Sequence, residues 1–273
     1  MIIKTVSNHH DGSLCLLKNG KVEEHITAER VTHIKHGSIC SEVLQYFGDI
    51  ENLKYCKLEE THHVFHAAHS FYDSGFHKAV CVVIDGMGSN VPLSEPLFTA
   101  GSYGRESISV YQIEYPCKIE LIHSEIIVPF KCDLSYGNYR VTSNSNPALM
   151  FQKTCESIGM KWYDAGKLMA MASYGNDNFH IDEDIMNLSS LWFDGNDLTN
   201  IKLKKKLETY EEQCDFAKSL QVKSQERVKN IVLEMVEKTG CKNVCMSGGY
   251  FLNCVSNTFV QKHLPKDVNT FIE

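Results

Sequence analysis

The sequence lacks a long apolar run, an excess of basic residues and any Cys-x-x-Cys pair. Its longest apolar stretches have only the length of a strand, which is too short for a transmembrane helix. The first residues also lack the apolar core of a signal peptide. With 27 basic and 34 acidic side chains the formal net charge is -7, which disfavours nucleic acid as a partner.

Cysteine is plentiful but irregularly placed. The chain has 11 cysteines, an odd number, and several lie inside apolar strand-like runs, among them Cys15, Cys81 and Cys245. This pattern does not suit a zinc knuckle or a disulfide framework, so we expect free thiols and a cytoplasmic protein. The 273 residues, 43% of them hydrophobic, suffice for one large domain or two lobes.

Short strand-like runs open the chain. They occupy residues 2–6, 13–17 and 22–26, and Asn19-Gly20 between the last two is a strong hairpin signal. The pattern then predicts helices at 41–47, from 61, at 146–158, at 166–172, a long one that ends at Gly240 and one near 252–263, and strands at 79–84, 107–114, 118–128, 243–246 and 270–273. Hairpin strands followed by strand–helix units predict a two-lobed α/β protein, with lobes of approximately 1–100 and 101–273.

Four histidines fall within the eight residues 62–69, where a helix is expected. His62 and His66 are four residues apart, so on a helix both imidazoles face one side and can bind one metal ion. His63 and His69 would point to other faces. Two histidines need at least one further ligand, and ordinary surface or core histidines are the alternative.

Two glycine-rich turns follow predicted strands. Asp85-Gly86-Met87-Gly88 comes after 79–84, which is apolar on both faces like the centre of a covered sheet. Ser247-Gly248-Gly249 comes after 243–246 and before Asn253. Glycines let backbone N–H groups approach a phosphate closely, and the aspartate can hold a cation. We therefore expect the turns to face one another across the cleft between the lobes, around a nucleotide, with plain tight turns as the alternative.

Two further groups of polar residues are candidates for anion binding or catalysis. Lys167 lies in the first turn of a helix that Asp164 can cap, where its charge opposes the helix dipole, so it is a candidate phosphate contact. Near the N-terminus, His10 and His36, with Lys35 beside His36, can perform acid–base chemistry near neutral pH. A solvated lysine and solvated turns are the alternative interpretations.

Six motifs together resemble the N-terminal domain of the O-carbamoyltransferase family, of the nodulation-factor and antibiotic-biosynthesis type. They are His10-Asp11; Glu29-Arg30 with Lys35-His36; His62-His63-Val64-Phe65-His66-Ala67-Ala68; Asp85-Gly86-Met87-Gly88; Asp164-Ala165-Gly166-Lys167-Leu168-Met169-Ala170 followed by Tyr174-Gly175; and Ser247-Gly248-Gly249 with Leu252-Asn253-Cys254. Each motif is loose by itself, whereas six in the family's order, along most of the chain, are specific.

The resemblance implies an actin-like ATPase fold, as in sugar kinases and heat-shock ATPases, and kinship with tRNA threonylcarbamoyl-transfer proteins. It also implies that carbamoyl phosphate and ATP give a carbamoyl-adenylate, whose carbamoyl carbon is attacked by an acceptor hydroxyl near a metal ion, expected to be iron. On the family's pattern His62 and His66 bind the metal, and the catalytic candidates are His10, His36 and Lys35. Contacts to the nucleotide are assigned to Asp85, Gly86, Gly88, Lys167, Gly248, Gly249 and Asn253.

The sequence departs from the family pattern at several positions. Ala28 replaces an expected Glu, His33 an expected Arg, and Ala170-Met171 an expected Gly-Leu. The family's Gly-Asp-x-Gly segment, whose Asp completes the metal site, and its adenylate-forming domain do not follow Glu273. We therefore expect residues 1–273 to be a C-terminally truncated actin-like domain that needs a C-terminal adenylate-forming polypeptide as partner.

Two other functions fit the motifs less well. A threonylcarbamoyl-type tRNA modifier is disfavoured by the acidic charge and by the Asp-x-Gly-Lys-x-Met run. A truncated binding or scaffold subunit without chemistry, and a homo-oligomer, both agree with the early end of the chain. Acceptor pockets are shaped by loops without a fixed motif, so the expected acceptor is a small molecule defined only by its hydroxyl group.

Overall fold

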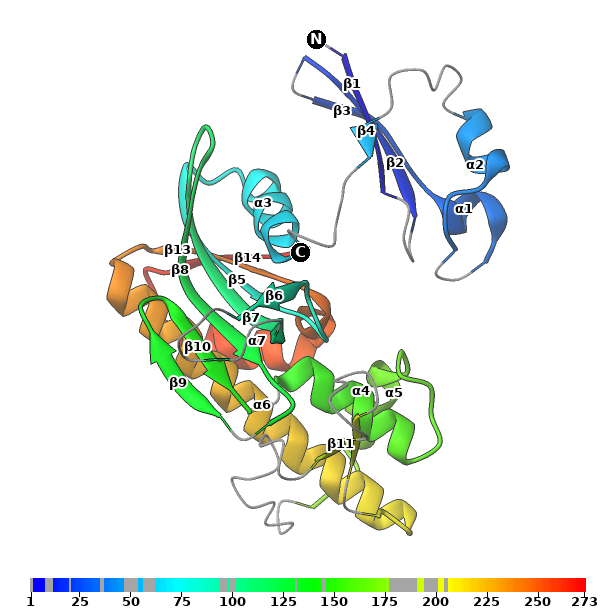
Figure 1. Ribbon diagram of the computed structural model, residues 1–273, viewed down its shortest axis with the longest axis vertical. Helices are drawn as coiled ribbons and strands as arrows, with labels where there is room; N and C mark the ends of the chain where they lie inside the picture. Colours follow the sequence, from blue (N-terminus) through cyan, green and yellow to red (C-terminus); the bar gives the residue numbers. More distant parts are fainter. Residues whose placement is uncertain are drawn as a thin grey trace. The chain divides into compact units, whose positions relative to one another are not determined.

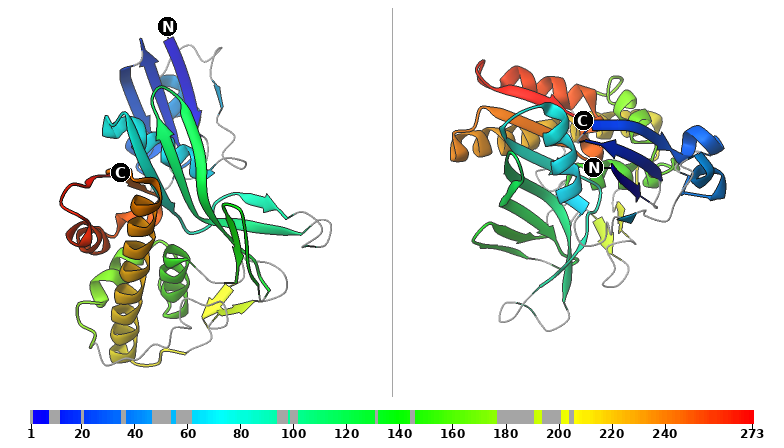
Figure 2. Two further views of the ribbon diagram at one scale, coloured as in Figure 1. Left: turned by 90° about the vertical axis from the view of Figure 1, so that its left-hand side faces the viewer. Right: turned by 90° about the horizontal axis from the view of Figure 1, so that it is seen from above.

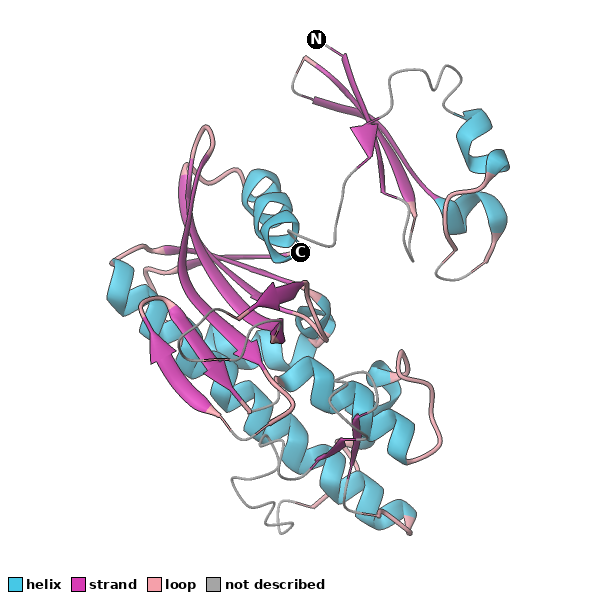
Figure 3. Cartoon of the chain, in the orientation of Figure 1, coloured by secondary structure: helices cyan, strands magenta, loops and turns pink. Residues whose placement is uncertain are grey.

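The computed structural model describes residues 2–7, 12–19, 21–34, 37–46, 54–55, 62–93, 98, 102–130, 132–143, 146–176, 191–193, 201–203 and 206–273. The chain divides into two compact units, Met1–Leu58 and Glu59–Glu273. Figure 3 distinguishes the helices and strands of both units. The division does not coincide with the expected lobe boundary near residue 100, because one sheet of the second unit contains strands from both sides of that position.

The first unit is built on a four-stranded sheet with the order β3-β2-β1-β4. β1 (Ile2–Ser7), β2 (Ser13–Lys18) and β3 (Lys21–Thr27) pair antiparallel, and β4 (Lys54–Tyr55) pairs parallel with β1. Asn19, with a φ of 53°, turns the chain between β2 and β3, so the predicted hairpin is confirmed. α1 (Ala28–Thr32) and α2 (Ser41–Tyr46) complete a small core of Val6, Leu14, Ala28 and Val43.

The second unit contains a larger sheet with the order β14-β13-β5-β7-β8-β10-β9. β5 (Lys78–Ile84) pairs antiparallel with β7 (Tyr103–Glu114) and parallel with β13 (Asn243–Ser247), and β13 pairs parallel with β14 (Asn269–Ile272). On the other side, β8 (Lys118–Ile127) is antiparallel to β7 and parallel to β10 (Tyr139–Thr142), and β9 (Asp133–Tyr136) forms the edge. β6 (Asn90–Pro92) pairs with the beginning of β7.

Helices cover both faces of this sheet (Figures 1 and 2). α3 (His62–Ser74) packs on one face. α4 (Pro147–Ser157), α5 (Ala165–Met171), α6 (Tyr210–Thr239) and α7 (Cys254–His263) gather on the other, around the largest core cluster. The 3₁₀ turn η5 (Gly249–Leu252) leads into α7, and β11 (Leu191–Phe193) pairs with β12 (Ile201–Leu203) in a separate ribbon.

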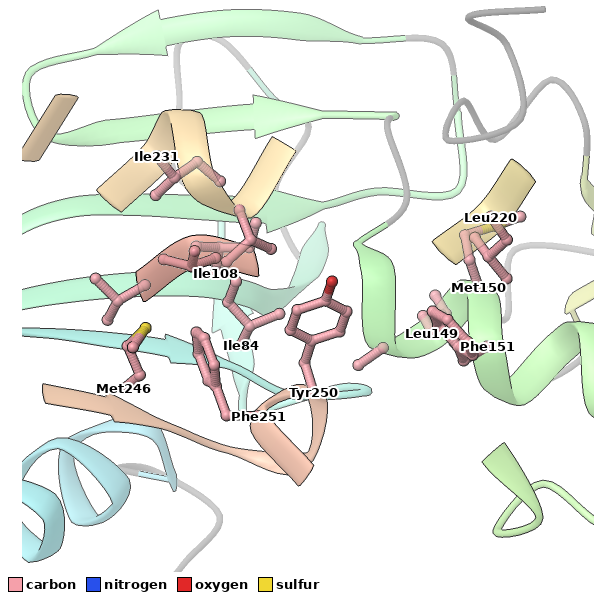
Figure 4. Close-up of a cluster of buried hydrophobic side chains, with 14 of the residues drawn as sticks. Ile84, Ile108, Leu149, Met150, Phe151, Leu220, Ile231, Met246, Tyr250 and Phe251 are labelled. Atoms are coloured by element: carbon pink, nitrogen blue, oxygen red, sulfur yellow. The ribbon is translucent and has the colours of Figure 1, made fainter. Parts of the chain in front are cut away.

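Alternate residues of β5 face the two helical layers, because successive side chains of a strand point to opposite faces. The even-numbered residues join the large cluster with α4, α6 and α7: Val80, Val82 and Ile84. Figure 4 shows this cluster around Ile84. The odd-numbered residues pack toward α3: Ala79, Cys81 and Val83. β5 is therefore buried on both faces, as its apolar sequence predicts.

The ends of two helices test the predicted caps. α6 begins with a capping box at Thr209 and ends at Gly240, which has a φ of 65°, so the predicted end is confirmed. The predicted cap of α5 is wrong, because the Asp164 side chain makes no cap hydrogen bond. Its carboxylate instead accepts from the Lys161 N–H at 3.1 Å and pairs with the Lys167 ammonium at 2.8 Å.

Ten cysteines lie in the described part of the chain, and each is a free thiol. Cys81 and Cys245 face one another in register across β5 and β13. In the described segments, no helix combines the length and the apolar character that a membrane crossing requires.

A buried ion cluster ties α6 to the far strands of the sheet. Glu125 of β8 is 4% exposed and accepts a hydrogen bond from Arg227 of α6, with 2.5 Å between Nη2 and Oε2. Arg140 and His123 lie 3.9 and 3.7 Å from the same carboxylate. Burial would raise the pKa of Glu125, but the charge of Arg227 and the contact with His123 lower it to about 2. A groove of about 800 Å³ lies beside this cluster, between α6 and the β8–β10 strands.

We expect Glu125→Gln to lower the free energy of unfolding by about 3 kcal/mol at pH 7. The pKa falls from 4.5 to about 2, and each unit corresponds to about 1.4 kcal/mol. Because the pKa of Glu125 is lower in the folded chain than in the unfolded chain, its ionised carboxylate stabilises the fold at pH values above the unfolded-state pKa. This stabilisation is lost as the pH falls through the folded-state pKa. The difference between variant and parent should therefore disappear between about pH 4.5 and pH 2.

Urea denaturation at stepped pH measures this effect. Glu120→Gln is the control, because Glu120 lies on the same strand with its side chain 57% exposed, and it should cost less than about 0.5 kcal/mol. A loss for Glu125→Gln that is equally large at acid and neutral pH would contradict the charge-based account.

Candidate functional site

α3 carries the pair of histidines that the sequence spacing singles out. Ala67 packs against the sheet, and His62 and His66 lie one turn apart on a partly exposed side of the helix. Their ring centroids are 4.8 Å apart and the rings are nearly perpendicular, at 84°. His63 is buried and His69 is exposed, so both point to other faces, as expected.

Asp85, the residue after β5, brings a carboxylate to these imidazoles. His62 Nε2 lies 2.6 Å from Asp85 Oδ2. One possible ligand atom from each of His62, His66 and Asp85 lies within 4.8 Å of the other two. Burial would raise the pKa of Asp85, but the hydrogen bond and charge of His62 hold it well below its usual range, so the carboxylate is ionised at neutral pH.

The three side chains form a donor set that suits a first-row divalent metal. Two imidazoles and one carboxylate are ligands that both zinc and iron(II) accept, with coordination positions left for a reacting group. All three residues are partly exposed. Within the described ranges, no other three His, Cys, Asp or Glu side chains meet the same distance. The residues present therefore fit a metal ion.

Asn146 fixes the backbone of the turn that carries Asp85. Its buried side-chain NH₂ donates to the carbonyl oxygens of Asp85 at 2.8 Å, Gly86 at 3.2 Å and Ser107 at 3.3 Å. Its Oδ1 accepts from the Leu149 N–H at 2.8 Å and so caps α4. The start of α4 is thereby joined to the end of β5, a contact that the Asn-Pro helix start alone did not indicate.

The start of α3 is anchored from the neighbouring strands. The His62 N–H donates to Ser89 Oγ at 3.3 Å, and the Ser89 N–H donates to the Glu106 carboxylate at 3.0 Å. His63 is fully buried, with Nδ1 2.7 Å from Ser109 Oγ, and burial lowers its pKa to about 3. His63 is therefore a neutral core histidine that supports the helix.

The two glycine turns lie side by side at one end of the sheet. β5 and β13 are parallel neighbours, so their C-terminal ends meet at the same edge. The Gly249 N–H donates to Asp85 Oδ1 at 3.3 Å, which confirms that the turns adjoin. The expected reason was wrong, because the turns meet through strand pairing within one sheet and not across a cleft between lobes.

Packing accounts for glycine at positions 88 and 248. A Cβ on Gly88 would lie 2.7 Å from His63 Nε2, and the Gly88 N–H donates to the Glu106 carbonyl at 2.9 Å. A Cβ on Gly248, whose φ is 98°, would lie 2.6 Å from the Ile84 carbonyl oxygen. These two glycines are explained without a phosphate, and nucleotide contacts remain predictions for Gly86, Gly88, Gly248 and Gly249.

Two other residues assigned to the nucleotide have local partners. The Lys167 side chain is 69% exposed and pairs with Asp164, one turn earlier. Asn253 caps α7, since its Oδ1 accepts from the Ser256 N–H at 3.0 Å and its NH₂ donates to Gln221 Oε1 at 2.9 Å. Among the contacts of the described residues, none joins Lys167 or Asn253 to the Asp85 turn, and their nucleotide roles remain predictions.

The predicted catalytic residues His10, Lys35 and His36 lie outside the described residues. Conversely, no sequence signal pointed to Glu273 or indicated that Ser247, the first residue of the second glycine turn, lies beside His66. Ser247 Oγ lies 3.3 Å from His66 Nδ1, and the Ser247 hydroxyl also donates to Glu273. Their approach to α3 depends on the order of β13 and β14 in the sheet, which local patterns do not encode.

Residues 38–269 match the model of the carbamoyltransferase N-terminus, and the chain therefore belongs to this family. The match includes His62, His66 and Asp85, and it begins after His36. The family expected from the six motifs is confirmed.

An uncharacterised Synechocystis protein, sll1178, is 25% identical over 219 residues, which cover 72% of this chain and 30% of that protein. The chain thus spans less than a third of the length of its curated relative. HypF of T. kodakarensis matches with a TM-score of 0.50 and 13% identity over 100% of this chain and 46% of HypF. Component A of (R)-2-hydroxyglutaryl-CoA dehydratase from Acidaminococcus fermentans gives a TM-score of 0.47 and 11% identity over 100% of this chain and 91% of that one. The predicted mixed α/β, actin-like ATPase fold is confirmed, and at these identities the HypF likeness concerns the fold alone.

Proposed function

We propose that the chain is the transfer domain of an O-carbamoyltransferase. It moves the carbamoyl group of a carbamoyl-adenylate, made from carbamoyl phosphate and ATP, to a hydroxyl of a small-molecule acceptor. Family membership supports the class of reaction. The observation that carries the proposal is the convergence of His62, His66 and Asp85 within 4.8 Å. Formation of the adenylate is assigned to a C-terminal adenylate-forming polypeptide, and the free thiols support a cytoplasmic setting.

In this proposal His62, His66 and Asp85 hold one iron ion. A bound metal supplies positive charge that stabilises negative charge developing on the carbamoyl oxygen. Asp85 thus takes a different role from the nucleotide contact assigned on sequence. The 2.6 Å approach of its carboxylate to His62 favours the metal, and its depressed pKa keeps it in the anionic form that a metal binds.

The transfer step is a substitution at the carbamoyl carbon. The acceptor oxygen forms the new bond to carbon, and the bond from that carbon to the phosphate oxygen breaks, so that AMP leaves with the electron pair. His10 or His36 takes the proton of the acceptor hydroxyl, and Lys35 stabilises charge in the transition state. The nucleotide is assigned to Gly86, Gly88, Lys167, Gly248, Gly249 and Asn253, and the adjoining turns after β5 and β13 support the glycine part of this assignment.

The test supplies carbamoyl phosphate, ATP and a panel of hydroxyl compounds to the 273-residue chain, with and without an adenylate-forming polypeptide. Mass spectrometry detects carbamoylated product and chromatography detects AMP. We expect no transfer by the chain alone and transfer when the polypeptide is added. The double variant His62→Ala, His66→Ala should lose at least about 100-fold of the transfer rate, while formation of the carbamoyl-adenylate, followed as release of pyrophosphate from ATP, persists. Turnover by the isolated chain would refute the assignment of adenylate formation to a separate polypeptide, and full transfer by the double variant would refute the role of the metal site.

A further inference from the structure

A string of side-chain contacts leads from the exposed part of α3 to His66. Asp73 Oδ2 lies 3.2 Å from His69 Nε2, and His69 Nδ1 contacts the Glu273 carboxylate. The Ser247 hydroxyl donates to the other oxygen of Glu273, and Ser247 Oγ lies 3.3 Å from His66 Nδ1. The string therefore ends on a ring nitrogen of one of the three residues that fit a metal ion.

The number of protons in this string determines the tautomer of His66. An ionised carboxylate only accepts hydrogen bonds, so the single proton of the Ser247 hydroxyl is directed to Glu273. Ser247 Oγ is then an acceptor toward His66, and the N–H that it accepts from is on Nδ1. A neutral imidazole with its proton on Nδ1 has its lone pair on Nε2, the form that can bind a metal through Nε2.

The surroundings of Glu273 agree with an ionised carboxylate. Both ring nitrogens of His69 face carboxylates, those of Glu273 and Asp73. One carboxylate oxygen of Glu273 faces His69 Nδ1, and the other accepts a hydrogen bond from the Ser247 hydroxyl. Glu273 is thus an acceptor for both Ser247 and His69.

We propose that Ser247 and Glu273 are positioning residues that hold the His66 ring with Nδ1 protonated and leave Nε2 available to a metal. The second ring nitrogen of a metal-binding histidine usually has such a partner, and its loss lowers metal affinity by about 10- to 100-fold. The inference rests on the metal site of the proposed function. It concerns the metal-free chain, however, so the two can fail separately.

The first test is ¹⁵N NMR of the histidine side chains in the metal-free parent chain. His66 is assigned from the signals that disappear in His66→Gln. We expect the ring proton on Nδ1, with a coupling pattern that places the lone pair on Nε2. A proton on Nε2 would overturn the inference, whatever the behaviour of any variant.

The second test is the Zn²⁺ affinity of Ser247→Ala, measured by competition with a chelating dye. We expect affinity lower by about 10- to 100-fold, together with a shift of His66 toward the other tautomer. The control is Ser70→Ala, which removes a buried hydroxyl from α3 that donates to the Ala67 carbonyl at 3.1 Å, and it should bind Zn²⁺ like the parent. Affinity of Ser247→Ala within about twofold of the parent would overturn the inference.

Failure of the parent chain to bind Zn²⁺ would count against the metal site itself, and the tautomer of His66 would still decide whether Ser247 positions the ring. If Ser247→Ala did not fold, judged by circular dichroism, the measurement on the parent chain would decide alone.

Discussion

Replacing Asp85 by Asn should lower the affinity of the chain for a divalent metal by at least about 100-fold, or about 3 kcal/mol. Asp85 is the only anionic member of the three-residue donor set, and Asn has nearly the same shape without the charge. Without the carboxylate charge, the side chain no longer attracts the cation. The variant also loses the ionised partner of His62, whose Nε2 lies 2.6 Å from Asp85 Oδ2. Competition titration with Zn²⁺ and elemental analysis of iron-loaded protein measure the effect.

The matched control for this variant is Asp267→Asn. Asp267 has a side chain 66% exposed that pairs with Lys242, so its replacement should leave metal affinity unchanged. The double variant His62→Ala, His66→Ala should bind no iron at this site. If it retained as much iron as the parent, the metal site would lie elsewhere in the chain, and a wild-type affinity for Asp85→Asn would remove that residue from the donor set.

Replacing Gly248 by Ala should destabilise the fold by about 4 kcal/mol. Its φ of 98° lies where L-residues are strained, and a Cβ would lie 2.6 Å from the backbone oxygen of Ile84. Backbone at the centre of a buried sheet cannot move away as a flexible side chain can. The strain and the overlap therefore add, and urea denaturation should show the loss directly.

Gly240→Ala separates the two causes. Gly240 has a φ of 65° at the end of α6, and nothing lies within 4 Å of its added Cβ, so it carries the strain without the overlap. We expect it to cost about 1 kcal/mol. Equal losses for the two variants would mean that the Ile84 contact contributes nothing to the requirement for glycine at position 248.

Local periodicity was sufficient for the elements that carry the site. The four-residue spacing of His62 and His66 predicted a shared helix face, and the continuous apolar run after residue 78 predicted a strand covered on both sides. The histidine spacing and the apolar run are both patterns of side chains within a single helix or strand, so they can be read from the sequence directly. The fold class followed from the resemblance of the six ordered motifs to one family.

Partners across the sheet were not predictable in the same way. The closeness of Asp85 to His62, and of Ser247 to His66, depends on which strands are neighbours and on the face that α3 covers. An apolar run gives no indication of its pairing partner, so the antiparallel pair of β5 and β7 across residue 100 was not foreseen. Long-range register is a property of the whole sheet.

Lys167 shows a different limit of the sequence argument, since a neighbouring carboxylate was visible in the sequence. Its position in the first turn of a helix suggested an anionic ligand, because a cation is unfavourable there. In the structure the carboxylate of Asp164, three residues earlier, lies 2.8 Å from the Lys167 ammonium. A carboxylate within one turn thus gives the lysine a local partner that the helix dipole alone does not indicate, and the phosphate contact of Lys167 stays a prediction.

The even-numbered and odd-numbered side chains of β5 face different helical layers. Val80, Val82 and Ile84 face the large core, whereas Val83 shares its face with the α3 layer and Asp85 continues that odd-numbered series. A change at an even position therefore alters the large core, whereas a change at an odd position alters the layer that holds α3 and its histidines. The same arrangement makes β5 intolerant of an inserted or deleted residue. A shift by one position would exchange the even-numbered and odd-numbered residues between the two faces of the sheet, and the Asp85 carboxylate would then point toward the large apolar core.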